Sequence, residues 1–271
     1  MIVDYHLHLR DEAGEIDFSR AAVERFVQAA GARGVDEIGF TEHDYYFRET
    51  RELWRVPYLS ERCRFELDSY CGAVLDAKSN GLPVKLGLEV DYVGDRQARL
   101  SELVAPYPWD FLLGSVHWLG DVAVDMEPGA WANATVEEVW RRYAGAVREL
   151  ASSGAVDVLA HFDLPKIYGR RPEPDTLAGI QRELAQAIAS AGLSVEISTA
   201  GLRKPVGELY PDRDLLRACT SLGVTVTLAS DAHEPRLVGE DFDRALEAAR
   251  DAGCETVTVF EGRRSRQEAL G

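Results

Sequence analysis

The segment Asp4-Tyr5-His6-Leu7-His8 lies at the end of the first apolar run of the chain. The run Ile2–Tyr5 predicts a strand, and residues two apart in a strand point to the same face. His6 and His8 would therefore present two imidazoles side by side, with Leu7 facing the other way. Two neutral imidazoles on one face form half of a metal site. A single His-x-His pair is weak evidence, so the remaining histidines decide its meaning.

All six histidines occupy comparable positions, at or just beyond the end of an apolar, strand-like run. The predicted strands are Ile2–Tyr5, Glu37–Thr41, Val84–Glu89, Phe111–Ser115, Val156–Ala160, Ser194–Ile197 and Thr225–Ala229, with Thr256–Phe260 as a weaker eighth. Helical spacing of apolar residues predicts the helices Phe18–Ala30, Thr135–Ser152, Thr176–Ala191, Asp212–Ser221 and Asp241–Ala252. Thr135-x-x-Glu138 indicates a capping box at the start of one helix.

The alternation of strands and helices predicts a parallel sheet within an α/β fold. The strand runs are apolar throughout, as expected when both faces are buried. The polar groups at the C-terminal strand ends distinguish an open sheet from a barrel, and they are His8, the Thr41–Asp44 group, Glu89, His117, His161 and Asp231. In a barrel all these ends converge on one mouth, whereas in an open sheet most would lie too far apart. We therefore expect a TIM-like barrel and a single domain over residues 1–271.

The composition excludes some classes of partner. The chain has 30 basic and 46 acidic residues, a net charge of −16, which argues against a general nucleic-acid or anionic-membrane surface. A small phosphorylated substrate remains compatible, because bound cations would dominate the local field. No signal peptide or membrane-length apolar stretch is visible, so we expect a cytoplasmic protein. The sequence leaves the oligomeric state open.

The polar strand ends carry imidazole and carboxylate groups but no thiolate, because the four cysteines lack metal-site spacing. Such ligands suit zinc, manganese or iron. Each histidine could instead be an ordinary hydrogen-bonded core residue, but five such strand ends together make that alternative weak. The ligands are too many for one ion, and Glu89 could bridge two. Two ions about 4 Å apart stabilise the attacking and the leaving oxygen in phosphoryl hydrolysis, and they generate hydroxide near neutral pH.

At this point the chain resembles the polymerase-and-histidinol-phosphatase (PHP) superfamily. The motifs that carry the resemblance are Asp4-Tyr5-His6-Leu7-His8, Thr41-Glu42-His43-Asp44, Gly87-Leu88-Glu89, Ser115-Val116-His117, Ala160-His161-Phe162-Asp163 and Ser230-Asp231-Ala232-His233. They span nearly the whole chain in the family's order. The resemblance implies a distorted seven-stranded (β/α)7 barrel, with a trinuclear metal cluster at its C-terminal mouth.

Two segments are similar to the histidinol-phosphatase branch of that superfamily. They are His161-Phe162-Asp163-Leu164-Pro165-Lys166 and the stretch from Glu196 to Pro211. In the second, Arg203 offers a planar, permanently charged fork that can hold phosphate bidentately. Lys166 and Lys204 are possible helpers in substrate binding, with ordinary surface charge as the alternative for all three residues.

The resemblance also implies which residues hold each ion. His6, His8, Glu89 and Asp231 would hold the first, Glu89 with His117 and His161 the second, and His43 with His233 the third. The branch usually supplies one more histidine shortly after the first motif, whereas this chain has none between Leu9 and Glu15. Asp11, Glu12 or Glu15 could substitute, or the third site could be weak or empty.

These observations predict a metal-dependent phosphomonoesterase that hydrolyses L-histidinol phosphate in histidine biosynthesis. A hydroxide bridging the first two ions would attack phosphorus, while the metals and Arg203 neutralise the phosphoryl oxygens. A metal-associated water or a nearby acid would protonate the leaving group, with Asp231 and His233 as candidate acids, and Glu89 is the bridging carboxylate.

Three alternatives remain. The same ligands fit a phosphatase or phosphodiesterase for another small phosphoester, such as a nucleotide. A non-catalytic, metal-binding regulator is disfavoured by the near-complete ligand set. An amidohydrolase is disfavoured because Glu89 occupies the place where that class uses a bridging lysine. The long connections Asp44–Ser60 and Trp118–Thr135 are either lids over the mouth or ordinary surface insertions.

Overall fold

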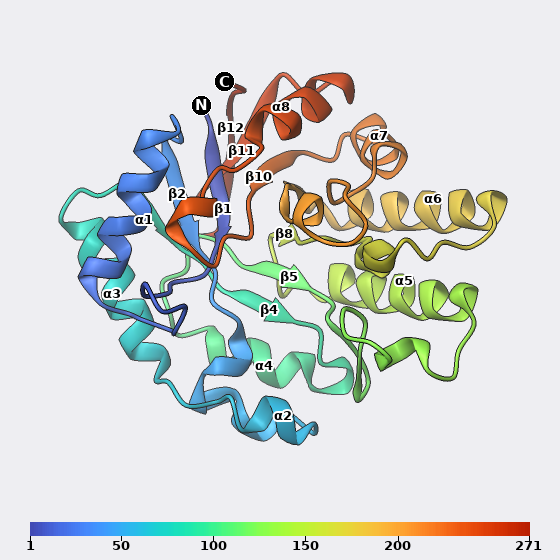
Figure 1. Cartoon of the computed structure of the whole chain (residues 1–271), viewed down its shortest axis with the longest axis horizontal. Coiled ribbons are helices and arrows are strands. Elements are labelled where there is room, and N and C mark those ends of the chain that lie inside the picture. Colours follow the sequence, from blue (N-terminus) through green and yellow to red (C-terminus); the bar gives the residue numbers. More distant parts are fainter.

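The computed structural model describes residues 1–271 and places short parallel strands at the centre with helices around them (Figure 1). The strands are β1 (Val3–Leu7), β2 (Glu37–Phe40), β3 (Val84–Leu86), β4 (Glu89–Asp91), β5 (Leu113–Ser115), β6 (Trp118–Leu119), β7 (Val122–Ala123), β8 (Val158–Leu159), β9 (Ser194–Ser198), β10 (Val226–Ala229), β11 (Thr256–Glu261) and β12 (Arg264–Ala269).

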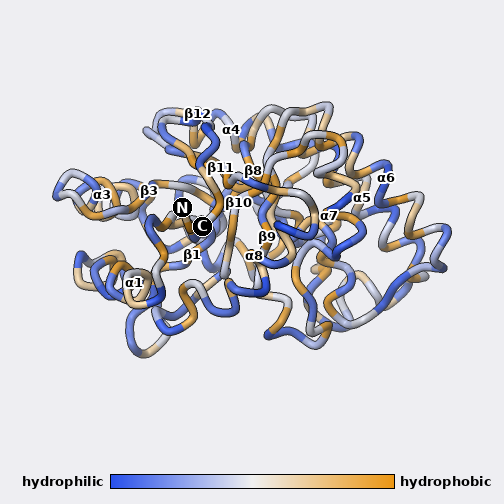
Figure 2. Tube along the Cα trace, turned by 90° about the horizontal axis from the view of Figure 1, so that it is seen from above, coloured by the Kyte–Doolittle hydropathy of each residue, from blue (hydrophilic) through white to orange (hydrophobic).

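The α-helices are α1 (Arg20–Ala32), α2 (Pro57–Ser60), α3 (Leu67–Ser79), α4 (Gln97–Val104), α5 (Val136–Ser152), α6 (Pro174–Ala191), α7 (Arg213–Ser221) and α8 (Phe242–Asp251). Short 3₁₀ helices are η1 (Asp44–Tyr46), η2 (Arg48–Leu53), η3 (Gly94–Arg96), η4 (Gly129–Trp131), η5 (Leu164–Tyr168), η6 (Ala200–Arg203) and η7 (Pro235–Leu237). Figure 2 shows polar and apolar residues alternating along the peripheral helices, whose apolar faces join the core.

The helices predicted from periodicity are present with small shifts at their ends. The capping box of α5 is confirmed, because Thr135 and Glu138 each bond the other's backbone nitrogen. Three α-helices were missed, namely the single turn α2 and the longer α3 and α4. In α3 the buried residues Leu67, Tyr70, Cys71 and Val74 follow helical spacing, so the signal was present in the sequence.

The strands form two parallel sheets, with the orders β1-β2-β3 and β10-β9-β8-β5-β4. The predicted α/β class with parallel strands is therefore confirmed. The single strand predicted at Val84–Glu89 is interrupted at Gly87 and Leu88. Its first half, β3, pairs with β2, and its second half, β4, pairs with β5. One stretch of chain thus links the two sheets.

The predicted barrel needs a correction, because the two sheets do not form one closed ladder. Strands β1 and β10 lie side by side (Figure 1), yet they are joined by only an isolated bridge between Leu7 and Ala232. The His8 amide donates to the carbonyl of Ala232 at 2.9 Å. The Asp4 carboxylate adds a bond from the backbone nitrogen of Ser230 at 2.8 Å. A short backbone bridge together with a side-chain bond therefore replaces regular strand pairing at this seam.

The C-terminal hairpin β11–β12 is antiparallel and lies outside both parallel sheets, so the weaker eighth strand is not part of them. Phe260 of β11 packs against Tyr5 and Phe111 with ring centroids 6.1 and 5.6 Å away. Glu261 forms ion pairs with Lys78 and Lys85 at the same end. The N-terminal ends of the strands are thereby closed, which leaves the C-terminal ends for a site.

Gly39 in β2 lies in the closely packed core at this closed end, where a larger residue would clash. A Cβ atom at Gly39 would lie 2.7 Å from Cζ of Phe111, whose ring is buried between Tyr5 and Phe260. We predict that Gly39→Ala lowers the free energy of unfolding by about 1–3 kcal/mol in urea denaturation, because the core is overpacked. The matched control Gly72→Ala sits in α3 with nothing within 4 Å of the added carbon. It should stabilise the protein by about 0.5–1 kcal/mol. An unchanged unfolding free energy for Gly39→Ala would contradict this packing.

Candidate metal centre

The polar residues that follow the strands meet around the carboxylate of Glu89, the first residue of β4. The fold positions each of them: His6 lies in β1, and His8, His43, His117, His161, Asp231 and His233 follow β1, β2, β5, β8 and β10. The imidazole nitrogens nearest to the Glu89 oxygens are His43 Nδ1 at 2.6 Å, His161 Nε2 at 3.3 Å, His6 Nε2 at 3.4 Å, His8 Nε2 at 3.6 Å and His117 Nε2 at 3.7 Å.

These groups are buried and lack ordinary partners. Both oxygens of Glu89, and Nε2 of His6 and His8, make no hydrogen bond. Buried polar atoms normally have partners, and an unpaired buried carboxylate is expensive. Four sets of ligand atoms lie close enough to hold an ion: His6-Glu89-His161, His6-His8-Asp231, His43-Asp91-His117 and His8-His43-His233. The donor set therefore fits several divalent cations with nitrogen and oxygen ligands.

Asp231 approaches the centre from the loop after β10. Its Oδ1 lies 3.4 Å from His8 Nε2 and 3.7 Å from His6 Nε2. Asp231 has φ 51° and His161 has φ 25°, values that are uncommon for residues other than glycine. The buried Asp4 carboxylate fixes the Asp231 loop, because it also accepts from the backbone nitrogen of Gly239 at 2.9 Å. The positive φ angles of Asp231 and His161 are strained, and strain of this kind is typical of residues whose side chains are held in place for function.

Two carboxylates that sequence reasoning missed orient the imidazoles. Glu196 of β9 lies 2.9 Å from His6 Nδ1 and accepts from the backbone nitrogen of His161 at 3.0 Å. Asp91 lies 3.0 Å from His117 Nδ1. Carboxylates placed behind ligating histidines fix the tautomer that offers the other nitrogen to metal. The signal for Asp91 was its spacing, since residues two apart on a strand share a face with Glu89.

The predicted substrate-binding residues differ in their surroundings. Arg203 donates to the carbonyl of Ser230 at 2.5 Å, beside the Asp231 loop, and its side chain is 24% exposed. Lys166 is completely buried, where it pairs with Asp163 at 2.7 Å and donates to the carbonyl of Leu209 at 2.6 Å. Lys204 is exposed. Arg203 thus lies next to the centre, whereas the charge of Lys166 is already neutralised.

None of the three acids proposed to complete the third site belongs to a ligand set: Asp11, Glu12 and Glu15. The Asp11 carboxylate accepts instead from the backbone nitrogens of Ala13 and Glu15 at 2.8 and 2.9 Å. Glu12 and Glu15 are exposed.

The two long connections lie over the same end of the molecule. The Tyr45 ring stacks on His43 with centroids 4.5 Å apart, and Tyr58 packs against Trp118 at 6.4 Å. The segments Asp44–Ser60 and Trp118–Thr135 therefore contact each other, and the first also contacts His43, one of the candidate metal ligands.

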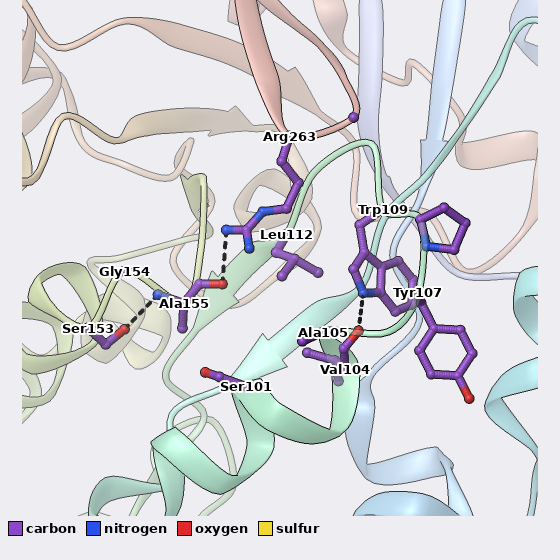
Figure 3. A pocket seen from close by; sticks show the side chains of 12 residues that line it. Ser101, Val104, Ala105, Tyr107, Trp109, Leu112, Ser153, Gly154, Ala155 and Arg263 are labelled. Carbon is purple, nitrogen blue, oxygen red and sulfur yellow. Dashed lines mark hydrogen bonds between the residues drawn. The ribbon is translucent and has the colours of Figure 1, made fainter.

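A cavity of about 500 Å³ lies elsewhere, beside the N-terminal ends of β5 and β8 (Figure 3). Arg263 donates to the carbonyl of Ala155 there, and Trp109 donates to the carbonyl of Val104. No histidine or carboxylate lines this cavity, so it is not the metal centre.

A family model described as the PHP domain matches residues 6–200. The chain therefore belongs to the PHP family, as the motifs predicted. A probable histidinol-phosphatase of Deinococcus radiodurans is 33% identical over 238 residues, which are 86% of this chain and 88% of that protein. The relatives place the chain in the histidinol-phosphatase branch of the family.

Two further relatives agree. A histidinol-phosphatase of Lactococcus lactis is 25% identical over 267 residues, or 96% of this chain and 94% of that protein. The crystal structure of histidinol phosphate phosphatase from Lactococcus lactis, complexed with zinc, L-histidinol and phosphate, has a TM-score of 0.78. It is 24% identical and covers 98% of both chains, so the two share their fold.

None of the helices has the length and apolarity that a membrane crossing requires.

Protons must leave this centre when metal enters. In the metal-free protein burial lowers the pKa of His117, but the charges of Asp91 and Glu89 outweigh it and raise this pKa to about 10. The pKa of His6 is also raised, because Glu196, Glu89 and Asp231 outweigh its burial. His117 is thus protonated at pH 7, the raised pKa of His6 favours its protonated form as well, and metal competes with these protons.

We predict that metal affinity rises with pH through the neutral range. Titration calorimetry at pH 7 in buffers of different ionisation enthalpy should show proton release on binding. Asp91→Asn removes a charge that favours protonated His117, so this variant should release fewer protons. Metal uptake without proton release, or an affinity that falls as pH rises, would contradict the assignment.

Proposed function

We propose that the protein is a metal-dependent phosphomonoesterase that hydrolyses L-histidinol phosphate to L-histidinol and phosphate. The observation that carries the proposal is Glu89, whose two unpaired, buried oxygens face different imidazoles. Oε2 faces His6, His8 and His43, while Oε1 faces His117 and His161. This arrangement suits a carboxylate shared between neighbouring ions. The PHP domain and the named relatives support the substrate.

The chain would hold one ion with His6, His8, Glu89 and Asp231, and another with Glu89, His117 and His161. Divalent ions in such a site lower the pKa of water and neutralise charge on phosphoryl oxygens. The chain's own contribution is to bind and orient. Glu196 and Asp91 hold the rings of His6 and His117, and the closed N-terminal end leaves a single end for the substrate.

The protonation states of Asp231 and His233 suit ligation. Burial raises the pKa of Asp231, but the nearby imidazoles outweigh it and hold this pKa well below its usual range. Burial and the charge of His8 lower the pKa of His233 to about 3. At neutral pH the metal-free protein therefore offers a carboxylate and a neutral imidazole here, the forms that bind metal.

We also propose that the two sheets together make a distorted barrel within one domain. Seven strand positions run in sequence order around the centre, with β3 and β4 sharing one position. The seam between β1 and β10 is bridged by Leu7 and Ala232. One apolar core connects strands of both sheets with the C-terminal hairpin.

The substrate is tested by phosphate release with zinc or manganese supplied. L-histidinol phosphate should be strongly preferred over a panel of nucleotides and sugar phosphates. His117→Ala should lower bound metal and kcat together, because it removes a ligand beside Glu89. Activity on other phosphoesters alone would show that the protein is a metal-dependent phosphatase with a substrate other than L-histidinol phosphate. No phosphatase activity from the metal-loaded protein would overturn the proposal.

We place Arg203 at the substrate phosphate. A hydrogen bond to a charged group contributes about 1.5–3 kcal/mol, so Arg203→Ala should raise KM by roughly ten- to a hundredfold. Arg203 also supports the Asp231 loop through Ser230, so metal content must be measured in the same variant. A raised KM with unchanged metal content supports phosphate binding. A loss of metal, or an unchanged KM, would remove Arg203 from the phosphate site. Lys204→Ala, an exposed neighbour, serves as the matched control.

A further inference from the structure

One of the four ligand sets differs from the others. His8, His43 and His233 bring three imidazoles together, with the His8 ring 4.1 Å from that of His233 and 4.4 Å from that of His43. Each of the other sets contains a carboxylate, whereas this one contains none. Asp231 Oδ1 lies 3.5 Å from His233 Nδ1, but this carboxylate already belongs to the set with His6 and His8. Only neutral ligands remain for an ion at this position.

Glu89 Oε2 also lies 2.6 Å from His43 Nδ1, but Glu89 is the carboxylate shared by the first two ions. The one remaining carboxylate beside this set, Glu42, is already paired with Arg10. Glu42 is fully buried, and its Oε2 lies 3.7 Å from His8 Nδ1. The guanidinium of Arg10 donates through Nη1 to both oxygens of Glu42, at 2.9 and 3.1 Å. Nη1 also donates to the carbonyl of Leu9 at 2.7 Å. Arg10 is only 5% exposed, so the ion pair is held in place by burial as well as by hydrogen bonds.

The balance of charge then opposes a third cation. An arginine side chain keeps its positive charge at any pH that a folded protein tolerates. Because this charge is paired with Glu42, that carboxylate is not available to His8, His43 and His233. A divalent ion among these three imidazoles would therefore have no free carboxylate to neutralise its charge where water is largely excluded. Glu89, Asp231 and Asp91 provide the carboxylates of the other three sets.

We propose that Arg10 takes the place of a third metal ion, so that the chain binds two divalent ions. The inference rests on the metal centre proposed above, but it concerns stoichiometry and not substrate. Arg10 follows the first motif by two residues, within the segment that lacks the additional histidine. Its guanidinium supplies a permanent positive charge that pairs with Glu42, the carboxylate beside His8.

The test is metal content per chain, measured by plasma mass spectrometry after saturation with zinc and removal of free metal. The wild-type protein should hold two ions. Arg10→Gln frees the Glu42 carboxylate, so this variant should hold a third. Arg10→Lys keeps the charge and should remain at two. Arg62→Gln is the matched control, since Arg62 lines the same surface cavity as Arg10 but forms no ion pair with Glu42.

The double variant Arg10→Gln/Glu42→Gln tests the role of the carboxylate and should return to two ions, because the freed Glu42 is the missing ligand. Three ions in the wild-type protein would overturn the proposal even if no variant folds. A folded Arg10→Gln protein that stays at two ions would also overturn it. The counts are made without substrate, so a failure of the phosphatase assay leaves this test intact.

Discussion

The carboxylate of Glu89 is the constraint on which the rest of the structure depends. It is fully buried, its two oxygens make no hydrogen bond, and five imidazoles surround it. Removing a charge from water without compensation costs several kcal/mol. Without metal, compensation comes from protonated imidazoles, which accounts for the raised pKa values of His6 and His117. With metal, the same nitrogens become ligands, so folding, protonation and metal binding are coupled at this residue.

The interruption of one strand puts Glu89 where it is needed. At Gly87 the backbone packs so closely that an added Cβ would lie 2.8 Å from Phe111 and 2.9 Å from Thr41. Beyond this point the strand pairs with β5, and Glu89 opens β4 between the two sheets while it stays bridged to His43, which follows β2. The seam between β1 and β10 brings the Asp231 loop to the same place, where the Asp4 carboxylate secures it. The two places where regular strand pairing is interrupted, between β3 and β4 and between β1 and β10, are thus the places where the metal-ligand candidates Glu89 and Asp231 lie.

Much of this arrangement could be predicted from the sequence, because histidine placement at strand ends is a local pattern. His6 and His8 lie where their spacing placed them, and the family followed from the motifs. The interruption of the third strand was not predictable, since it depends on which distant strands offer hydrogen bonds. The supporting role of Glu196 was hidden because its partner, His6, is 190 residues away. The sequence showed that a histidine is missing after the first motif, but it did not show which residue takes over. Asp11 accepts hydrogen bonds from the nearby backbone, whereas Arg10 forms the ion pair with Glu42.

The most direct test of the central role of Glu89 is a crystal structure of the zinc-loaded protein with anomalous diffraction data collected at the zinc edge. The account predicts two strong anomalous peaks, one on each side of the Glu89 carboxylate and each within coordination distance of a different oxygen. One peak would lie beside His6, His8 and Asp231, and the other beside His117 and His161. Peaks that do not contact Glu89, or a single ion coordinated elsewhere, would contradict it.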